Sequence, residues 1–447
     1  MTNLLTDVIL DKHQLIKYFA DPSLPRSEWR TGLECEIFAV RQDTLAPVPF
    51  YGEQGIEMIL KKLVEMYGWS PVLEGMAVIG LEKGDARITL EPGGQIEFSG
   101  PPCYLITQCM AERDAFIAQL KEVTQPMGIG LMYIGYHPVA APEDAQWMPK
   151  DRYRLMSAYF AKHGGQLAHH MMKLTTSVQA SIDYEDEADF SRKVMLASYL
   201  TPVLQGIYAN SPFQRGNFSG SFGLRGMCWE DTDNDRCGLM MKAFSGNYGF
   251  EDYVDYLLAM PMILKFTDEG AVPMEGLPFK EYLESNTVAM EEWDSHVSFV
   301  FPEIRLRKYI ELRMCDAPPY ALMPTIPALL KGLLYDRSAQ AALEDIFRKV
   351  SPEEALQAYQ EVHHLALRGQ YFGRPLLELA REVVSIGEQG LRNLGREGIL
   401  SAPEERDLLE PLKEQLWDKG MSPAEELVQL WEKKGRDLLK IRDRLLL

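Results

Sequence analysis

The sequence contains only six cysteines, and none of them has the paired spacing of a metal site. They are Cys35, Cys103, Cys109, Cys228, Cys237 and Cys315. A chain of 447 residues can bury enough core to fold without disulfide bonds. The cysteines therefore predict a reducing compartment, the cytoplasm.

A cationic start and a long apolar run are both missing from the N-terminus. Residues Met1 to Lys17 mix acidic with apolar side chains, which argues against a signal peptide and against a membrane span. Basic residues are also in deficit, because 46 Lys and Arg face 65 Asp and Glu and leave a net charge of -19. Such a charge repels nucleic acid and anionic membranes. We expect a soluble protein that binds neither.

The glycine-rich motifs of common nucleotide-binding folds are absent. The chain has no Gly-x-x-x-x-Gly-Lys-[Ser/Thr] sequence and no Rossmann fingerprint. A nucleotide would then have to be held by a metal, by basic side chains and by a sheet surface. The composition itself is that of a globular enzyme, since 46% of the residues are hydrophobic and 25% are charged.

The stretch from Arg87 to Gly100 alternates polar and apolar residues on both sides of a tight turn. This period predicts a hairpin of two half-buried strands that carries Glu91 and Glu97 on its polar side. Pro92 presets φ for the second position of the turn, and Gly93 accepts a positive φ at the third. We therefore expect a type II turn.

Two further stretches predict strands with one polar face. Glu34 and Glu36 stand two residues apart in a strand-like run and so share a face, although an isolated pair of this kind is often a solvated strand edge. The stretch from Lys173 to Asp183 also alternates and places Gln179 on its polar face. If one sheet holds all these side chains, they line a site.

Helical periodicity predicts helices at 53–67, 105–123 and 187–208, and nearly throughout 321–447. A buried strand is predicted at 131–136. The helical C-terminal part has no chemical cluster, so we interpret it as a scaffold or a subunit interface.

Basic residues stand in two predicted loops. Lys150 and Arg152 lie close together in a proline-containing loop, where they either bind a carboxylate or phosphate or are simply exposed. Residues 214–238 are rich in glycine and polar groups without periodicity, and they contain Arg225 and Trp229. A long segment of this kind is typical of a lid or a substrate loop.

The stretch 305–313 predicts a strand whose polar face sets an acid between basic neighbours. The residues on this face are Arg305, Arg307, Tyr309, Glu311 and Arg313. Such a face suits a phosphate and a metal together.

Five glutamates lie on the predicted strand faces: Glu34, Glu36, Glu91, Glu97 and Glu311. Without a counter-charge, each close pair would be repelled by about 4 kcal/mol at an effective dielectric constant near 20. A divalent cation removes this repulsion, and oxygen ligands favour Mg²⁺, or Mn²⁺, over zinc. Since Mg²⁺ commonly links carboxylates to nucleotide phosphates, the acids predict ATP chemistry.

Seven collinear motifs over about residues 30 to 320 resemble one family. They are Glu34-x-Glu36, Glu91-Pro92-Gly93-Gly94-Gln95-x-Glu97-x-Ser99-Gly100, Met148-Pro149-Lys150-x-Arg152-Tyr153, Thr176-x-Val178-Gln179, Ala209-Asn210-Ser211-Pro212-Phe213, Trp229-x-Asp231-Thr232-Asp233-x-Asp235-Arg236 and Phe301-Pro302-Glu303-x-Arg305 to Arg313. Together they resemble the plant and proteobacterial type of glutamate–cysteine ligase. The resemblance implies an α+β, glutamine synthetase-like fold, in which a curved antiparallel sheet forms a funnel with helices outside. Residues 1–320 would form the catalytic core, and residues 321–447 would be a helical region packed on it within the same domain.

The resemblance also implies a reaction. With Mg²⁺ on the phosphates, ATP transfers its γ-phosphoryl group to the side-chain carboxylate of glutamate, and the amine of cysteine attacks the acyl phosphate in the first step of glutathione biosynthesis. The implied metal ligands are Glu34, Glu36, Glu91, Glu97 and Glu311. The implied catalytic residues are Arg313 and Glu311, with Arg225, Trp229, Gln179, Lys150 and Arg152 on the substrates and Arg305 and Arg307 on the nucleotide.

The sequence departs from the family pattern at three places. Cys35 replaces a histidine, Ile37 replaces a basic residue, and the stretch 314–319 lacks the usual glycines. In an ideal strand Cys35 points away from its acidic neighbours. We therefore expect that a cysteine in place of histidine affects the packing of the strand and not the acidic face. These departures leave the identity of the amine acceptor open. A ligase that uses another amine is one alternative, and a non-catalytic ATP-binding relative is another. We expect a cytoplasmic monomer or homodimer.

Overall fold

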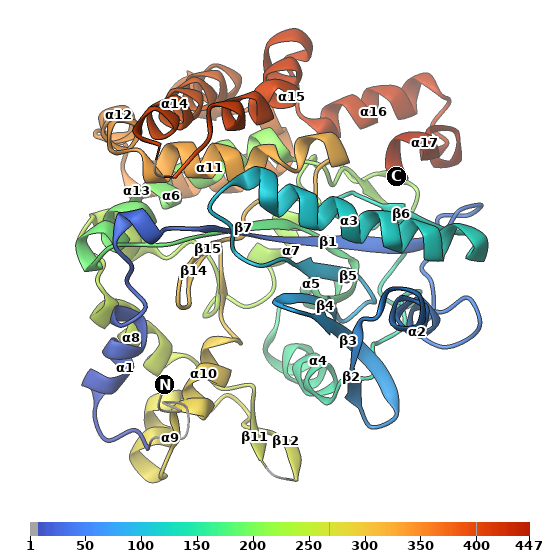
Figure 1. The fold of residues 1–447 in the computed structure, drawn as a ribbon, viewed down its shortest axis with the longest axis horizontal. Helices are drawn as coiled ribbons and strands as arrows, with labels where there is room; N and C mark the ends of the chain where they lie inside the picture. The colour runs from blue at the N-terminus through green and yellow to red at the C-terminus, as the bar shows by residue number, and fades with distance from the viewer. Residues whose placement is uncertain (1–7, 268, 399) are drawn as a thin grey trace.

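The computed structural model describes residues 8–267, 269–398 and 400–447 and is built on a nine-stranded antiparallel sheet (Figure 1). Eight strands lie in the order β14 (Ile304–Leu306), β15 (Ile310–Leu312), β7 (Val178–Ile182), β1 (Thr31–Arg41), β5 (Ile96–Ser99), β4 (Ala86–Leu90), β3 (Ala77–Lys83) and β2 (Ser70–Glu74); β6 (Ile129–Met132) also pairs with β1. In Figure 1, β2 and β3 bend away from the line of β1. The sheet is therefore curved.

The long central strand β1 shows why the sheet has two unlike faces. Its apolar Leu33, Cys35 and Ile37 are buried, while Glu34 and Glu36 between them are only half-buried. Because successive side chains point to opposite faces, one face of the sheet is apolar and the other is polar. The neighbouring strand β5 keeps the same alternation.

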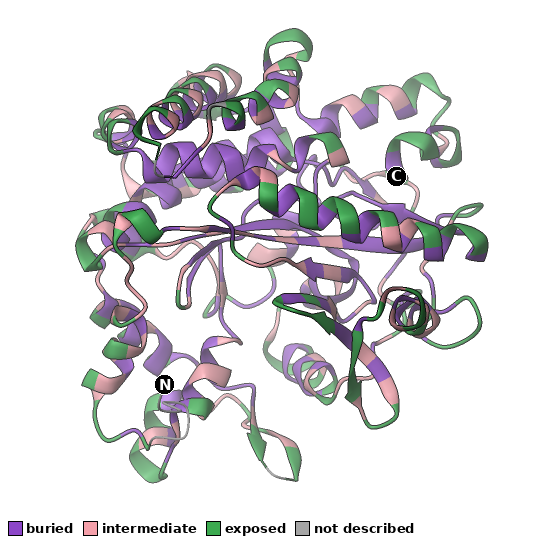
Figure 2. Ribbon diagram, viewed as in Figure 1, coloured by how far each residue is buried: buried purple, intermediate pink, exposed green. Residues whose placement is uncertain are grey.

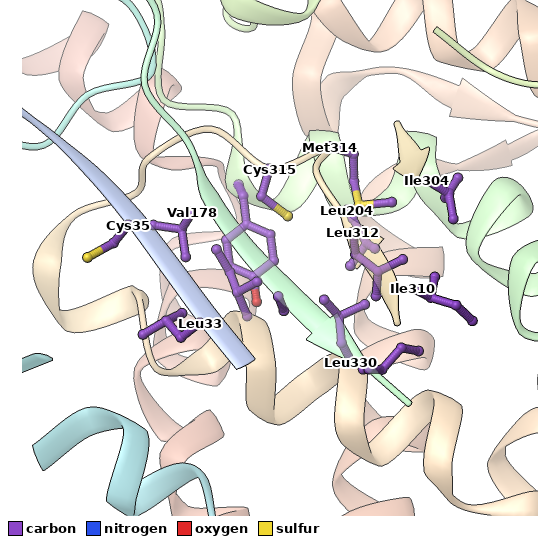
Figure 3. Close-up of a cluster of buried hydrophobic side chains, with 14 of the residues drawn as sticks. Leu33, Cys35, Val178, Leu204, Ile304, Ile310, Leu312, Met314, Cys315 and Leu330 are labelled. Atoms are coloured by element: carbon purple, nitrogen blue, oxygen red, sulfur yellow. The ribbon is translucent and has the colours of Figure 1, made fainter. Parts of the chain in front are cut away.

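Helices cover the apolar face (Figure 1). Packed there are α3 (Ile106–Thr124), α6 (Glu187–Tyr208), α11 (Thr325–Tyr335) and, behind them, α12 (Arg337–Phe347), α13 (Pro352–Leu365) and α14 (Leu376–Glu397). Every residue of α11 is buried, as its colour in Figure 2 shows. Figure 3 shows Leu33, Cys35 and Val178 of the sheet and Leu330 of α11 in one cluster of buried side chains. The C-terminal helices thus complete the core of the sheet.

The opposite side of the sheet is walled by shorter elements. These are α4 (Asp151–His163), α5 (Ala168–Leu174), α7 (Leu224–Glu230) and α10 (Met290–Val297), with α1 (Lys12–Ala20), α8 (Phe250–Ala259), α9 (Phe279–Ser285) and the hairpin β11 (Leu264–Thr267) and β12 (Gly270–Pro273) beyond them. Helix α2 (Ile56–Tyr67) packs on β3 and α3.

The remaining elements are short strand pairs and the end of the chain. The pairs are β8 (Phe213–Gln214) with β9 (Asn217–Phe218), β10 (Cys237–Gly238) with β13 (Phe301–Pro302), and β16 (Gln370–Tyr371) with β17 (Arg374–Pro375). The last helices are α15 (Glu410–Lys413), α16 (Pro423–Lys433) and α17 (Arg442–Leu445). The end of the chain returns to the sheet, because Leu446 forms a bridge with Met132 of β6.

The predicted helices are confirmed within a few residues. Helix α6 has the predicted bounds, and α2 and α3 begin within three residues of their predicted starts. The helical C-terminal part is also confirmed. The strand predicted at 131–136 begins two residues earlier and ends at Met132.

The predicted type II turn is wrong. Gly94 rather than Gly93 has the positive φ, at 90°, and the amide of Gly94 donates to the carbonyl of Glu91 at 2.9 Å. A left-handed residue after the turn is the arrangement of a three-residue hairpin loop. Gly93 is needed for another reason, since a Cβ there would lie 2.2 Å from the carbonyl oxygen of Lys173.

The single strand predicted at 305–313 is also wrong. It is a hairpin, in which β14 and β15 pair antiparallel and Arg305 stands opposite Glu311. The amide of Arg307 donates to the carbonyl of Tyr309 at 2.9 Å and closes the turn. The alternation missed the turn because it holds on both arms. Folding back turns a sequence spacing of six residues into a direct cross-strand contact.

Candidate active site

A cavity of about 550 Å³ opens over the polar face of the sheet. Strands β1, β4, β5 and β7 supply its floor, and residues of α4, α5 and α7 form its walls. Every site residue predicted from the sequence lines it except Glu311. The lining members are Glu34, Glu36, Glu91, Glu97, Lys150, Arg152, Gln179, Arg225, Trp229, Arg305, Arg307 and Arg313.

Four glutamates make one half of the cavity acidic. Glu36 on β1 stands directly opposite Glu97 on β5, and Glu34 lies two residues before Glu36 on the same face. Burial, together with the charge of Glu97, raises the pKa of Glu34 well above its ordinary value, that of Glu36 to about 7 and that of Glu91 to about 8. These carboxylates therefore lack sufficient positive charge in their surroundings.

Hydrogen bonds fix two of the acidic side chains. Oε2 of Glu36 accepts from the amide of Ser177 at 2.7 Å, and Oε2 of Glu97 accepts from the hydroxyl of Thr89 at 2.8 Å. Thr89 lies on β4, the neighbour of β5, and Ser177 comes directly before β7, the neighbour of β1. The acidic half is thus ordered by the sheet itself.

The acidic half is an open row and not a closed ligand cage. Among the described residues, no three His, Cys, Asp or Glu side chains converge as a ready-made metal site. Mg²⁺ usually takes one or two carboxylates and completes its shell with water and substrate phosphates. Oxygen-only donors in a row, with like charges directly opposite each other, suit a cation of that kind.

Arginines make the other half of the cavity basic, and Glu311 binds two of them. Its Oε2 accepts from Nε of Arg305 at 2.5 Å and from Nη1 of Arg313 at 3.2 Å. Burial raises the pKa of the Glu311 carboxyl, but the two guanidinium groups outweigh this effect and hold the pKa at about 2. Glu311 is therefore charged and already paired, and it lies behind the arginines.

Helix α7 brings Arg225 and Trp229 into the wall. Nη2 of Arg225 donates to the carbonyl of Arg313 at 2.9 Å, and Trp229 has the Arg225 and Arg313 guanidinium groups over its ring at 5.9 and 5.5 Å. Within the described part of the chain, buried Nε of Arg225 and Nε1 of Trp229 have no hydrogen-bond partner. These two donors could bind a ligand carboxylate.

The remaining predicted cations of the cavity lining are Lys150, Arg152 and Arg307. Nζ of Lys150 donates to the carbonyl of Leu90 at 2.8 Å, and burial lowers the pKa of this amine. Arg152 lies over the ring of Phe299 at 4.9 Å. Arg307 lies in the β14–β15 turn, and its Nη2 is 3.9 Å from Oδ1 of Asp294.

The segment 214–238 is more ordered than predicted. It contains α7 and the short strands β8, β9 and β10. In its acidic run, Asp233 forms a buried ion pair with Arg236 at 2.6 Å, and Arg236 donates to the carbonyl of Phe299. This run therefore stabilises the wall, and only the helix contributes to the cavity.

Sequence reasoning missed three methionines of the cavity lining and one buried acid next to Arg225. Met156, Met171 and Met172 line the cavity from α4 and α5, but their helical spacing is indistinguishable from that of core residues. Asp316 accepts from the amide of Asn210 and the hydroxyl of Ser211 and lies 4.0 Å from Arg225. Its burial is decided by tertiary packing.

The fold has a solved counterpart. The structure of glutamate–cysteine ligase from Francisella tularensis in complex with AMP is similar, with a TM-score of 0.54 and 13% identity over 93% of this chain and 88% of the other. The curved antiparallel sheet, apolar under helices and polar over a cavity, is the glutamine synthetase-like fold. The predicted fold class is confirmed.

Sequence similarity covers nearly the whole chain. It is 33% identical over 432 residues to glutamate–cysteine ligase A, chloroplastic, of Oryza sativa subsp. indica, covering 95% of this chain and 85% of the relative. Identity is also 33% over 431 residues to the chloroplastic glutamate–cysteine ligase of Arabidopsis thaliana, covering 94% and 80%. Residues 30–440 match the model of Glutamate-cysteine ligase family 2 (GCS2). The chain belongs to this family, and the resemblance inferred from the motifs is confirmed.

Among the helices of the described residues, none has both the length and the apolar character needed to cross a bilayer.

Proposed function

We propose that the protein joins the γ-carboxylate of glutamate to the amine of cysteine at the expense of ATP, the first step of glutathione biosynthesis. The observation that carries this proposal is a single cavity that combines an acidic row with an arginine cluster. Family membership and the names of the relatives support the same reaction. The AMP bound in the Francisella structure is in keeping with a nucleotide substrate.

The acidic half is the proposed site for Mg²⁺, or Mn²⁺, held by Glu34, Glu36, Glu91 and Glu97. When bound, such an ion would neutralise charge on the phosphates of ATP. The raised pKa values of three of these carboxyls support the assignment, because a cation there supplies the missing positive charge. Glu311 was predicted as a fifth ligand, but its ion pairs favour the role of anchoring Arg305 and Arg313.

The arginines are the proposed electrostatic partners of the reacting groups. Arg313 would stabilise charge on the phosphoryl group as it moves from ATP to the glutamate carboxylate, with release of ADP. Arg305 and Arg307 would contact the nucleotide phosphates. The cysteine amine then attacks the acyl phosphate, and phosphate leaves.

The amino-acid substrates would contact the walls of the cavity. Arg225 and Trp229 offer unpartnered donors for a substrate carboxylate. Lys150 and Arg152 also line the cavity and are proposed contacts of the second amino acid. Gln179 was predicted as a substrate contact, but its amide is held by protein groups.

Several broader assignments rest on the same proposal. Residues 1–320 would be the catalytic core and 321–447 the helical scaffold; residues 1–7 lie outside the described residues. The shared apolar core, which contains residues of both parts, supports a single domain. The six free cysteines suit the proposed cytoplasmic location, although the relatives are named chloroplastic. A monomer or homodimer is proposed, and light scattering of the purified protein tests it.

One assay tests the function. The protein is incubated with Mg²⁺, ATP, glutamate and a panel of amines, and ADP and the new amide are followed together. We expect one amide and one ADP per turnover with cysteine. A different preferred amine would contradict only the acceptor, whereas the absence of amide with every amine would contradict the ligase function.

A further inference from the structure

The amide of Gln179 lies between a carboxylate and a guanidinium group on the cavity floor. Its Oε1 accepts from Nη1 of Arg313 at 2.6 Å. Its Nε2 donates to Oε1 of Glu36 at 3.3 Å and to Oγ of Ser177 at 3.1 Å. The reverse orientation would set amide hydrogens against the guanidinium group. Both ends of this buried amide are therefore occupied by protein partners.

The strand register sets this position. On one side of β7, Gln179 stands opposite Glu34 of β1. On the other side of β7, Ala180 pairs with Leu312 of β15, the residue before Arg313. Strand β7 thus separates the acidic strand β1 from the basic strand β15. The Gln179 amide is the group through which Glu36 and Arg313 are connected.

A neutral amide between opposite charges has a physical consequence. Charge-assisted hydrogen bonds between carboxylate and guanidinium are strong, and they are stronger in a buried site. If the amide is removed, Glu36 and Arg313 are free to pair directly. One such pair would remove a carboxylate from the acidic row and a cation from the basic half at the same time.

We infer that Gln179 is a positioning residue, which keeps Arg313 directed at the reacting phosphoryl group and prevents its capture by Glu36. This inference rests on the proposed ligase function and replaces the predicted substrate contact for Gln179. A residue that acts in this way affects the rate of the bound complex more than the affinity for substrates.

The first test is Gln179→Met, which keeps the length of the side chain and removes its three hydrogen bonds. We expect kcat to fall roughly 10- to 100-fold, because displaced catalytic groups cost about that much. The KM values for glutamate and cysteine should change less than about threefold. The matched control is Gln340→Met on α12, where a buried Nε2 donates to the carbonyl of Leu334; its kcat should be unchanged.

Two further variants separate positioning from other roles. Gln179→Glu keeps an acceptor for Arg313 and should retain more activity than Gln179→Met. In an Arg313→Lys background, Gln179→Met should cost less than about threefold, because the interaction that it controls is already lost. If Gln179→Met does not fold, the kcat and KM values of Gln179→Glu provide the test.

The outcomes distinguish the alternatives. A rise in one KM at unchanged kcat would identify Gln179 as a substrate contact and overturn the inference. An equal loss of kcat with and without Arg313 would overturn it as well. An inactive wild-type protein would contradict the proposed ligase function, whereas an active one unaffected by Gln179→Met would contradict only the positioning role.

Discussion

At the scale of single residues, charges in the cavity are organised by what lies beside them. Glu36 and Glu97 stand directly opposite each other, whereas Glu311 is paired with Arg305 and Arg313. The same residue type therefore has opposite pKa shifts at two positions of one sheet. The unpaired acids are suited to bind a cation, and the paired one to hold arginines.

The variant Glu311→Gln tests this division. It keeps the shape of the side chain but removes the charge that holds Arg305 and Arg313, so we expect kcat to fall at least 100-fold, on the order of losing one preorganised electrostatic contact. Circular dichroism should show a folded protein. Steady-state assays of ADP release provide the measurement.

A matched control for this change is Glu405→Gln. Glu405 is buried and pairs with Lys331 at 2.9 Å, outside the cavity lining. Its loss should lower the melting temperature and leave kcat near that of the wild type. Near-normal turnover of Glu311→Gln would contradict the anchoring role.

At the scale of elements, close backbone approaches decide where glycine is required. The β4–β5 loop packs on the end of α5, where Gly93 meets the backbone of Lys173. Helices α11 and α14 cross at Gly332, Gly387 and Gly390, and a Cβ on Gly390 would lie 2.0 Å from the carbonyl oxygen of Gly332. In both places a side chain would have to displace backbone.

We expect Gly93→Ala to lower both stability and turnover. The added methyl group displaces the loop that sets the separation of Glu91 and Glu97. The control is Gly75→Ala at the β2–β3 tip, where φ is +60° and no atom lies within 4 Å of the added Cβ. That control should cost only about 1–2 kcal/mol of backbone strain. Thermal unfolding and ligase assays compare the two, and equal effects would refute the role given to Gly93.

We expect Gly390→Ala to lower the free energy of unfolding by about 1–3 kcal/mol through overpacking. The direction of the change in stability is informative, because in a helix free of contacts a Gly→Ala change would raise the free energy of unfolding by about 1 kcal/mol. Ser385→Ala, on the exposed side of α14, serves as the control and should have little effect. Urea unfolding measures both, and a stabilised Gly390→Ala would show that the crossing is looser than the structure has it.

At the scale of the whole molecule, burial of neutral histidines links stability to pH. Burial lowers the pKa of His137 to about 3 and that of His296 to about 4, against about 6.5 in an unfolded chain. Below pH 6.5 the unfolded chain therefore binds protons that the folded chain does not. The free energy of unfolding must decrease as the pH falls from 6.5 towards 4.

The variant His296→Gln should reduce this pH dependence. The wild-type residue contributes roughly 3 kcal/mol to the loss of stability over that window, at 1.36 kcal/mol for each unit of pKa difference. Urea unfolding at pH 4.5 and 7 gives the difference directly, with the exposed His13→Gln as the control. If His296→Gln kept the pH dependence of unfolding seen in the wild type, a buried neutral His296 would not be its cause.

The sequence by itself determined the polar and apolar faces of β1, β5 and β7, the main helices and most of the charged cavity residues, because alternation and helical periodicity are local properties. Only the tertiary structure decided the β14–β15 hairpin, the pairing of Glu311 with two arginines, the need for Gly93 and the contacts of Gln179. These features depend on which strands become neighbours and on their register. That choice is made by the burial of a whole face against distant helices, which a local pattern does not encode.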